Sequence, residues 1–148
     1  MALHGPIARL NELTQGITTA ILTTVRPDGT LHSRPMATRG IEADGAFWFL
    51  TNSNTEKVEA VRTQQRVSLC FADAAANRYV SVSGFCELVR ERSRSKELWD
   101  PNYKNWLPQG LDDENLILMK IVVQQAEYWD TAQGRMVALT GFDAAAIT

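Results

Sequence analysis

This 148-residue sequence has little of what metal-binding and disulfide-linked proteins use. It holds two cysteines, Cys70 and Cys86, in separate apolar segments without a CxxC pair, and two histidines, His4 and His32, far apart in the chain. Small buried thiols are the simplest interpretation of such cysteines, and a disulfide between them stays open as an alternative. Without a cluster of His and Cys ligands, a zinc site is not expected.

An excess of one charge and a long hydrophobic run are also missing. The 15 Lys and Arg side chains against 17 Asp and Glu leave a net charge of −2, whereas nucleic-acid-binding proteins usually carry a basic excess. The most apolar late segment, LILMKIVV, is short and contains Lys120, so no membrane crossing is expected. The first residues lack the apolar run of a secretory signal. We therefore expect one cytoplasmic domain over residues 1–148, with no nucleic-acid or membrane partner.

Several catalytic motifs do not occur. The sequence has no GxSxG, GxxxxGK[ST], GxGxxG or HExxH pattern. It also shows no pair of carboxylates pointing inward from an apolar strand, as glycoside hydrolysis requires. If the protein is an enzyme, we expect a bound cofactor to supply the reactivity.

What is present is a run of short strands interrupted by helices. Apolar spacing predicts helices at 7–15, 54–64 and 91–99, and strands at 17–25, 31–41, 46–51, 66–73, 78–89, 116–123 and 126–134. Residues 100–114 are expected to form a structured loop, and the weak pattern of 135–148 predicts a partly mobile tail. Gly84 inside an alternating strand indicates a bulge or a bend. This order favours a largely antiparallel sheet, α+β in the broad sense, and closure into a barrel would protect its edges.

The stretch FLTNSNTEKVEAV, residues 49–61, predicts a strand that runs into a helix through a cluster of small polar residues. Free amides, hydroxyls and Lys57 at a helix N-terminus suit a phosphate. The pattern from Ser53 to Glu56 also matches a capping box, which needs no ligand, and we expect Glu56 to serve it. Capping leaves Lys57 unexplained, because a cation is unfavourable beside the positive end of the helix dipole.

Two further groups are candidates for a binding site. On the strand at 31–41, His32 and Arg34 point to one face, and Pro35 places the stretch at an edge or a bulge. Arg34 is either an exposed strand arginine or a phosphate ligand. In the loop at 100–114, the aromatic Trp106 either covers one end of a barrel or packs on a flat ring.

The order of these motifs resembles that of the pyridoxamine 5′-phosphate oxidase-like split-barrel flavoproteins. The matching segments are RPM on the second strand, FLTNSNTEK leading into a helix, and RVSLCF on the next strand. Thr55 and Lys57 match the Ser and Lys of the phosphate site in that superfamily, and Glu56 stands where it usually has an arginine. The later segment, from WDP through WLPQG to EYWD, is similar to the general stress protein 26 subgroup.

This resemblance implies a mainly β fold with flanking helices, a six-stranded antiparallel split β-barrel of Greek-key character. It implies a homodimer with FMN at the interface, FAD being possible. The phosphate would be held by Arg34 and Lys57, helped by Thr55 and Ser53. Trp106 would contribute from the other subunit. The implied cofactor-binding residues are Arg34, Pro35, Met36, Ala37, Leu50, Thr51, Ser53, Thr55, Lys57 and Trp106, and no catalytic side chain is nominated.

The resemblance leaves more than one function open. The first is an FMN-dependent oxidoreductase of the general stress protein type, with redox chemistry at the flavin N5 and a small-molecule electron donor or acceptor. The second is a non-catalytic flavin carrier or stress sensor. A barrel for haem or the deazaflavin F420 is a third, disfavoured because the chain has few histidines and no further basic cluster. The end of the chain lacks the arginine- and histidine-bearing segment of the oxidase itself, so vitamin B6 oxidation is not expected.

Overall fold

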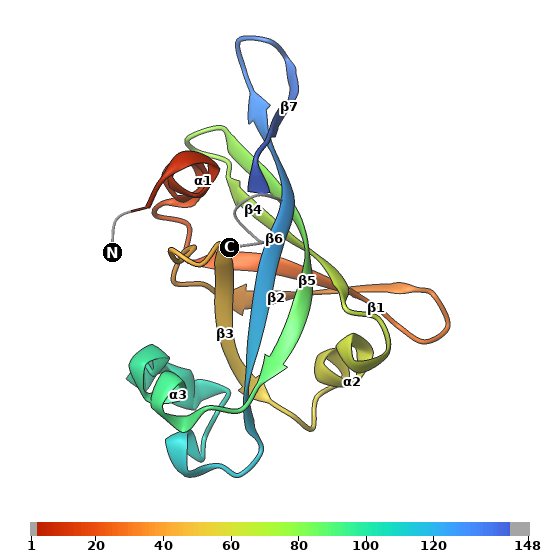
Figure 1. Ribbon diagram of the computed structural model, residues 1–148, viewed down its shortest axis with the longest axis vertical. Helices are drawn as coiled ribbons and strands as arrows, with labels where there is room; N and C mark the ends of the chain where they lie inside the picture. The colour runs from red at the N-terminus through yellow and green to blue at the C-terminus, as the bar shows by residue number, and fades with distance from the viewer. Residues whose placement is uncertain (1–2, 143–148) are drawn as a thin grey trace.

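The computed structural model describes residues 3–142, which form a curved sheet with short helices at its ends and sides (Figure 1). In chain order the elements are α1 (Gly5–Thr14), β1 (Thr19–Val25), β2 (Leu31–Ala37), β3 (Ala46–Asn52), α2 (Glu56–Thr63), β4 (Arg66–Asp73), β5 (Arg78–Val89), α3 (Arg92–Leu98), the 3-10 helices η1 (Pro101–Asn105) and η2 (Gly110–Asp112), β6 (Leu116–Asp130) and β7 (Arg135–Leu139).

All strand pairs are antiparallel, in the order β2-β1-β4-β5-β6-β3, and β7 pairs with β6 beside this path. Consecutive strands β2 and β3 therefore lie at opposite ends of a six-stranded path, which gives the sheet Greek-key character. No described residue of β2 pairs with β3, so the barrel is split along this line. The predicted mainly β, antiparallel split-barrel fold with flanking helices is confirmed.

The end of the chain differs from the expectation. The segments 116–123 and 126–134 were predicted as two strands, but β6 runs without a break over 15 residues. The polar pair Gln124 and Gln125 does not end it, because β5 continues to pair on both sides of these residues. Within the expected mobile tail, β7 is a strand paired to β6, and the rest of that tail from residue 143 lies outside the described residues.

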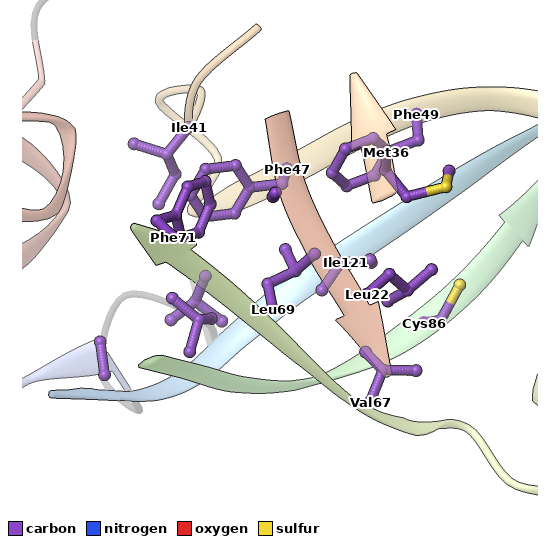
Figure 2. Close-up of a cluster of buried hydrophobic side chains, with 14 of the residues drawn as sticks. Leu22, Met36, Ile41, Phe47, Phe49, Val67, Leu69, Phe71, Cys86 and Ile121 are labelled. Atoms are coloured by element: carbon purple, nitrogen blue, oxygen red, sulfur yellow. The ribbon is translucent and has the colours of Figure 1, made fainter. Parts of the chain in front are cut away.

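The inward faces of the strands form the main core. Alternate residues of β1 and β4 point inward, so that Leu22 and Leu69 are fully buried between the strands. They pack with Phe47 of β3 and Ile121 of β6, and Phe47 contacts the ring of Phe71 at 5.2 Å between centroids (Figure 2). This core supports β2 and β3 from inside.

A second, smaller core lies on the other face of β3 and β6. Leu50 and Leu118 pack there against Leu98 of α3 and Leu107 of the loop that follows η1. This cluster fixes α3 and the 3-10 helices beside the end of β3 (Figure 1). Among residues 3–142, no helix has the length and apolar content needed to cross a bilayer.

Gly84 marks the predicted bulge, where the register between β5 and β6 shifts between Ser83 and Gly84. A Cβ at this position would lie 2.2 Å from the carbonyl oxygen of Val122, so the two backbones approach more closely than any side chain allows. Because a bulge bends its strand, this close approach helps the sheet to curl.

We expect Gly84→Ala to lower the free energy of unfolding by about 2 kcal/mol or more, since the contact is with backbone that has no free space to move into. Chemical denaturation of both proteins measures the difference. Gln125→Ala, at an exposed position opposite Ser83, is the control and should stay within about 0.5 kcal/mol of the wild type. Equal effects of the two substitutions would contradict this account.

Candidate functional site

A cavity of about 390 Å³ lies at the split of the barrel, between β2, β3, the start of α2 and η1. Its size is that of small-molecule binding pockets. The residues lining it are Thr19, Arg34, Pro35, Met36, Ala37, Leu50, Thr51, Lys57, Tyr103 and Trp106.

Eight of the ten residues predicted from the sequence line this cavity. Ser53 and Thr55 do not, although both lie in the segment between β3 and α2. Thr19 and Tyr103 were not among the predicted ligands. Thr19 enters because it pairs with Ala37 across β1 and β2, and Tyr103 because η1 carries it beside Trp106. Only the strand register and the loop conformation reveal these two.

The edge position of β2 brings four consecutive residues, 34–37, to the cavity. Pro35 has no N–H to donate, and a prolyl residue is tolerated here because β2 has a partner strand on one side only. On the facing edge, Leu50 and Thr51 are buried residues of β3. The cavity is thus walled by the two strands that end the sheet.

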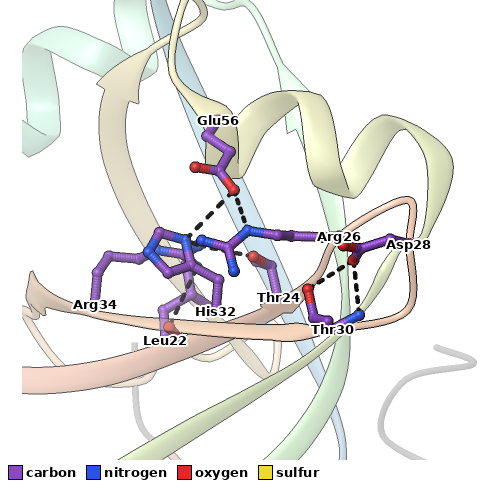
Figure 3. Close-up of polar contacts among 8 residues, drawn as sticks. All are labelled: Leu22, Thr24, Arg26, Asp28, Thr30, His32, Arg34 and Glu56. Carbon is purple, nitrogen blue, oxygen red and sulfur yellow. Dashed lines mark hydrogen bonds and ion pairs between the residues drawn. The ribbon is translucent and has the colours of Figure 1, made fainter.

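Arg34 lies at one end of the cavity, held by acceptors that carry no formal charge. Its Nη1 donates to the carbonyl oxygen of Leu22 at 3.2 Å, and its Nη2 donates to Thr24 Oγ1 at 2.8 Å and to His32 Nδ1 at 2.6 Å (Figure 3). Burial lowers the pKa of Arg34, the nearby charge of Glu56 opposes this shift, and the charge of Arg26 adds to it. No carboxylate among the described residues forms an ion pair with it. Arg34 is therefore a fixed cation that still has donor capacity.

Lys57 is the second cation and lies in the first turn of α2. It is half-buried, and its side-chain ammonium forms no hydrogen bond or ion pair within residues 3–142. Burial lowers its pKa, and the neighbouring charge of Arg34 adds to this effect. Two cations without a counter-ion, beside a helix N-terminus, are suited to bind an anion.

The predicted capping box is wrong. The helix begins later than the pattern indicated, with Thr55 as the N-cap residue and no side-chain cap bond. The Ser53 amide already donates to the carbonyl oxygen of Asn115 at 2.7 Å. Glu56 instead accepts from Arg26 Nε at 2.5 Å (Figure 3). The partner of Glu56 is thus an arginine 30 positions earlier in the chain, which a local pattern does not show.

The opposite wall of the cavity is aromatic. The Tyr103 ring lies 5.1 Å from that of Trp106 and 5.8 Å, edge to face, from that of Trp99. Tyr103 is half-buried, whereas Trp106 is 50% exposed, a high value for so large an apolar side chain. The resemblance implied that Trp106 reaches the site from another subunit, and in the described residues Trp106 lines the cavity of its own chain. The wall offers flat faces for a planar ligand.

The chemical character of the cavity is that of a binding site. The lining contains two cationic side chains, Arg34 and Lys57, and it contains no carboxylate, histidine or cysteine side chain. Within residues 3–142 no group of three or more His, Cys, Asp and Glu side chains is placed to hold a metal. Cys86 is buried elsewhere, and burial raises its pKa to about 12, so its thiol stays protonated. The arrangement fits a ligand with a flat apolar part and an anionic group.

The sequence pattern of the family described as pyridoxamine 5′-phosphate oxidase like matches residues 6–148. The chain belongs to this family. A curated relative, Protein bli-3 of Neurospora crassa, is 28% identical over 89 residues, which are 57% of this chain and 43% of that protein. The chain thus covers less than half the length of this relative.

Solved structures of similar fold include proteins of the general stress protein 26 type. A Clostridium acetobutylicum protein related to general stress protein 26 has a TM-score of 0.78 and 19% identity, over 94% of this chain and 96% of that one. General Stress Protein 26 of Bacillus anthracis has a TM-score of 0.75 and 22% identity, over 90% and 98%. A heme binding protein of Mycobacterium smegmatis has a TM-score of 0.71 and 14% identity, over 99% and 62%.

Lys57, whose ammonium has no partner among the described residues, predicts how the stability of the protein responds to anions. We expect Lys57→Met to keep the unfolding free energy within about 0.5 kcal/mol of the wild type or above it, because a desolvated cation without a partner is removed. Sulfate should raise the melting temperature of the wild type and have little effect on Lys57→Met, since only binding to the folded state stabilises. Thermal unfolding with and without sulfate measures both.

Arg62→Met is the matched control, because Arg62 is on the same helix, exposed and paired with Glu59. It should keep the full response to sulfate. A response that Lys57→Met retains would show that the anion binds elsewhere.

Proposed function

We propose that this protein is an FMN-binding flavoprotein, an oxidoreductase of the general stress protein type whose redox chemistry takes place at the flavin N5. The observation that carries the proposal is the pair Arg34 and Lys57, two cations without a counter-ion at one end of a cavity that is otherwise uncharged. Membership in the pyridoxamine 5′-phosphate oxidase-like family supports it.

The residues present fit the parts of FMN. Arg34 and Lys57 would hold the phosphate, the first by its remaining N–H groups and the second by its ammonium. The flat ring would lie along residues 35–37 of β2, where main-chain groups reach its polar edge, with Leu50 and Thr51 on the other side. FAD shares this ring and is the other flavin considered.

The flavin, when bound, supplies the transfer of hydride or electrons, and the chain supplies its environment. Arg34 and Lys57 fix the phosphate, and the apolar lining of Met36 and Leu50 keeps water from the ring. The indole of Trp106 would offer the ring a flat face. Because no carboxylate, histidine or cysteine lines the cavity, we expect the protons of the reaction to come from the donor, the acceptor or water.

The absence of a carboxylate, histidine or cysteine from the lining favours a second candidate, a flavin carrier or stress sensor without turnover. The two candidates differ in one measurement, the reduction of the bound flavin by NADH or NADPH under anaerobic conditions. Steady reduction by either nucleotide supports the oxidoreductase, and its absence with both supports the carrier.

A haem protein is the third candidate, since one solved relative is a heme binding protein. No histidine or cysteine lines the described cavity, and His32 Nδ1 already accepts a hydrogen bond from Arg34. The absorption spectrum of the purified protein separates the cofactors. Flavin gives a yellow protein that bleaches with dithionite, whereas haem gives an intense Soret band.

Replacing both cations tests the phosphate assignment. We expect Arg34→Ala with Lys57→Ala to weaken FMN binding by about 100-fold or more, because two charge-assisted contacts are lost. Riboflavin, which has the ring and no phosphate, should lose less than about threefold. Fluorescence titration of both ligands measures the ratio. The double variant Arg62→Ala with Arg92→Ala, at exposed paired arginines, is the control. Equal losses for FMN and riboflavin would refute the assignment.

The partner we propose is a second copy of the chain, seated on the outward face of β2, β1, β4 and β5. The strand register places Pro35, Ile21, Cys70 and Ser81 in one outward row, and Ser33, Thr23, Ser68 and Ser83 in the next. Neither row carries a charge, and Ile21 is 41% exposed. An uncharged face suits an interface, because charged residues are depleted at interface cores. Because Pro35 also lines the cavity, the partner would lie beside the flavin.

Introducing a charge on this face tests the homodimer. We expect Cys70→Arg to shift the mass measured by light scattering from that of two chains to that of one, since the arginine would be buried without a counter-ion. FMN affinity should fall with it. Gln109→Arg, at an exposed loop position, should leave the mass unchanged. A wild type that is monomeric would refute this proposal, and FMN binding would then belong to the single chain.

A further inference from the structure

His32 does not line the cavity, yet it lies between Arg34, which does, and Glu56 of α2 (Figure 3). Its Nδ1 lies 2.6 Å from Arg34 Nη2 and 3.8 Å from Glu56 Oε1. The ring is thus placed between a cation on its own strand and a carboxylate on α2. The two contacts require opposite states of the same nitrogen.

The contact with Arg34 determines whether Nδ1 of His32 carries a proton. A guanidinium has donors and no acceptor, so Nδ1 must accept and carry no proton. His32 in this arrangement is a neutral imidazole with its proton on Nε2. With Thr24 Oγ1 and the Leu22 carbonyl, it completes a set of three uncharged acceptors that hold Arg34.

Protonation reverses this contact. An imidazolium has N–H donors on both nitrogens, so Nδ1 would then present a proton and a positive charge to Arg34 Nη2. Two donors of like charge cannot stay 2.6 Å apart. Glu56 is the available alternative, because its Oε1 lies close to Nδ1 and is only partly engaged by Arg26.

The other charged groups around His32 leave this choice intact. Arg26, which follows β1, is bound to Glu56, and among the described residues Lys57 on α2 forms no hydrogen bond or ion pair with His32. In the β1–β2 turn, Asp28 accepts from the amide and hydroxyl of Thr30. The hydrogen bond from Arg26 lowers the pKa of Glu56, so this carboxylate stays ionised in weak acid.

We propose that His32 is a positioning residue that holds Arg34 in its anion-binding conformation only while the imidazole is neutral. This rests on the proposed function of Arg34 as a phosphate ligand. When His32 takes up a proton, its Nδ1–H turns to Glu56 and Arg34 loses one of the three acceptors that hold its guanidinium in place. The site therefore binds the phosphate of the cofactor less tightly in weak acid, although the protein then carries more positive charge.

The direction in which FMN affinity changes with pH distinguishes a positioning role of His32 from a purely electrostatic effect of its charge. A positive charge added near an anion site normally strengthens binding, so protonation of a neutral bystander histidine would tighten the complex as the pH falls. A positioning role predicts the reverse. The phosphate itself also takes up a proton near pH 6, at its second pKa, and weakens binding in every variant. The test therefore depends on the difference between variants.

The variants are His32→Asn and His32→Leu. Asparagine keeps an acceptor at the δ position of the side chain and does not titrate, whereas leucine has none. At about pH 8 we expect His32→Asn to bind FMN within about threefold of the wild type and His32→Leu about tenfold more weakly. Between about pH 8 and about pH 5, the wild type should lose about tenfold more affinity than His32→Asn. Fluorescence titration of FMN at each pH gives these values.

Three controls keep the result specific. His4→Gln removes the other histidine of the chain and should keep the wild-type pH profile. Riboflavin, without the phosphate, should show no difference between the wild type and His32→Asn. Glu56→Gln removes the alternative partner of the imidazolium and should move the acid loss to lower pH, whereas Glu59→Gln on the same helix should not.

A wrong flavin assignment and a wrong role for His32 give different binding results. If the wild type binds neither FMN nor riboflavin, the proposed function is wrong and with it the role of His32. If the wild type binds FMN and its pH profile runs parallel to that of His32→Asn, or binds more tightly in acid, His32 is not a positioning residue and the flavin proposal stands. The comparison with His32→Asn decides this even if His32→Leu does not fold.

Discussion

The structure depends on a sheet that curls around one core without closing. β2 and β3 end the hydrogen-bonded path, and both press apolar side chains into the same interior, Met36 from one and Phe49 from the other (Figure 2). The core draws the two edges together, and the missing ladder between them leaves the cavity. Gly84 contributes from the far side of the barrel, because the close backbone contact at the bulge lets β5 bend over β6.

Unpaired edges normally invite other strands to bind, and this chain protects them in two ways. Pro35 removes a donor from β2, and the second core covers the outer face of β3 with α3 and the 3-10 helices. The same covering segment brings Tyr103 and Trp106 to the cavity. Edge protection and the aromatic wall of the site are therefore consequences of one packing arrangement.

Of the four charged residues at the site, two form an ion pair and the other two are cations without an ion-pair partner among the described residues. Arg26 and Glu56 neutralise each other, whereas Arg34 and Lys57 have no counter-ion among the described residues. Half-buried cations without a partner reduce the stability of the empty protein. In a protein that is only marginally stable such groups are typical of a binding site, where the ligand supplies the missing charge. Glu56, which replaces a usual arginine of the family, lowers the total charge of the site and offers His32 a second partner.

The sequence by itself determined the elements whose signals are local. The alternation of apolar residues places β4 and β5 at the predicted bounds, Gly84 shows the bulge, and RPM followed by FLTNSNTEK contains six of the residues that line the cavity. Local patterns are sufficient there because alternation, turn residues and motif order depend on neighbours in the chain. The misfit of Lys57 beside a helix N-terminus was likewise visible without any coordinates.

Only the tertiary structure decided which groups meet. Glu56 pairs with Arg26 rather than with its own helix, because the β1–β2 hairpin carries Arg26 to α2. Thr19 and Tyr103 reach the cavity through strand register and through the packing of Leu98 and Leu107, and β6 continues past its polar residues because β5 still pairs with it. These contacts join segments far apart in the chain, and their free energy comes from long-range packing and pairing, which no local pattern records.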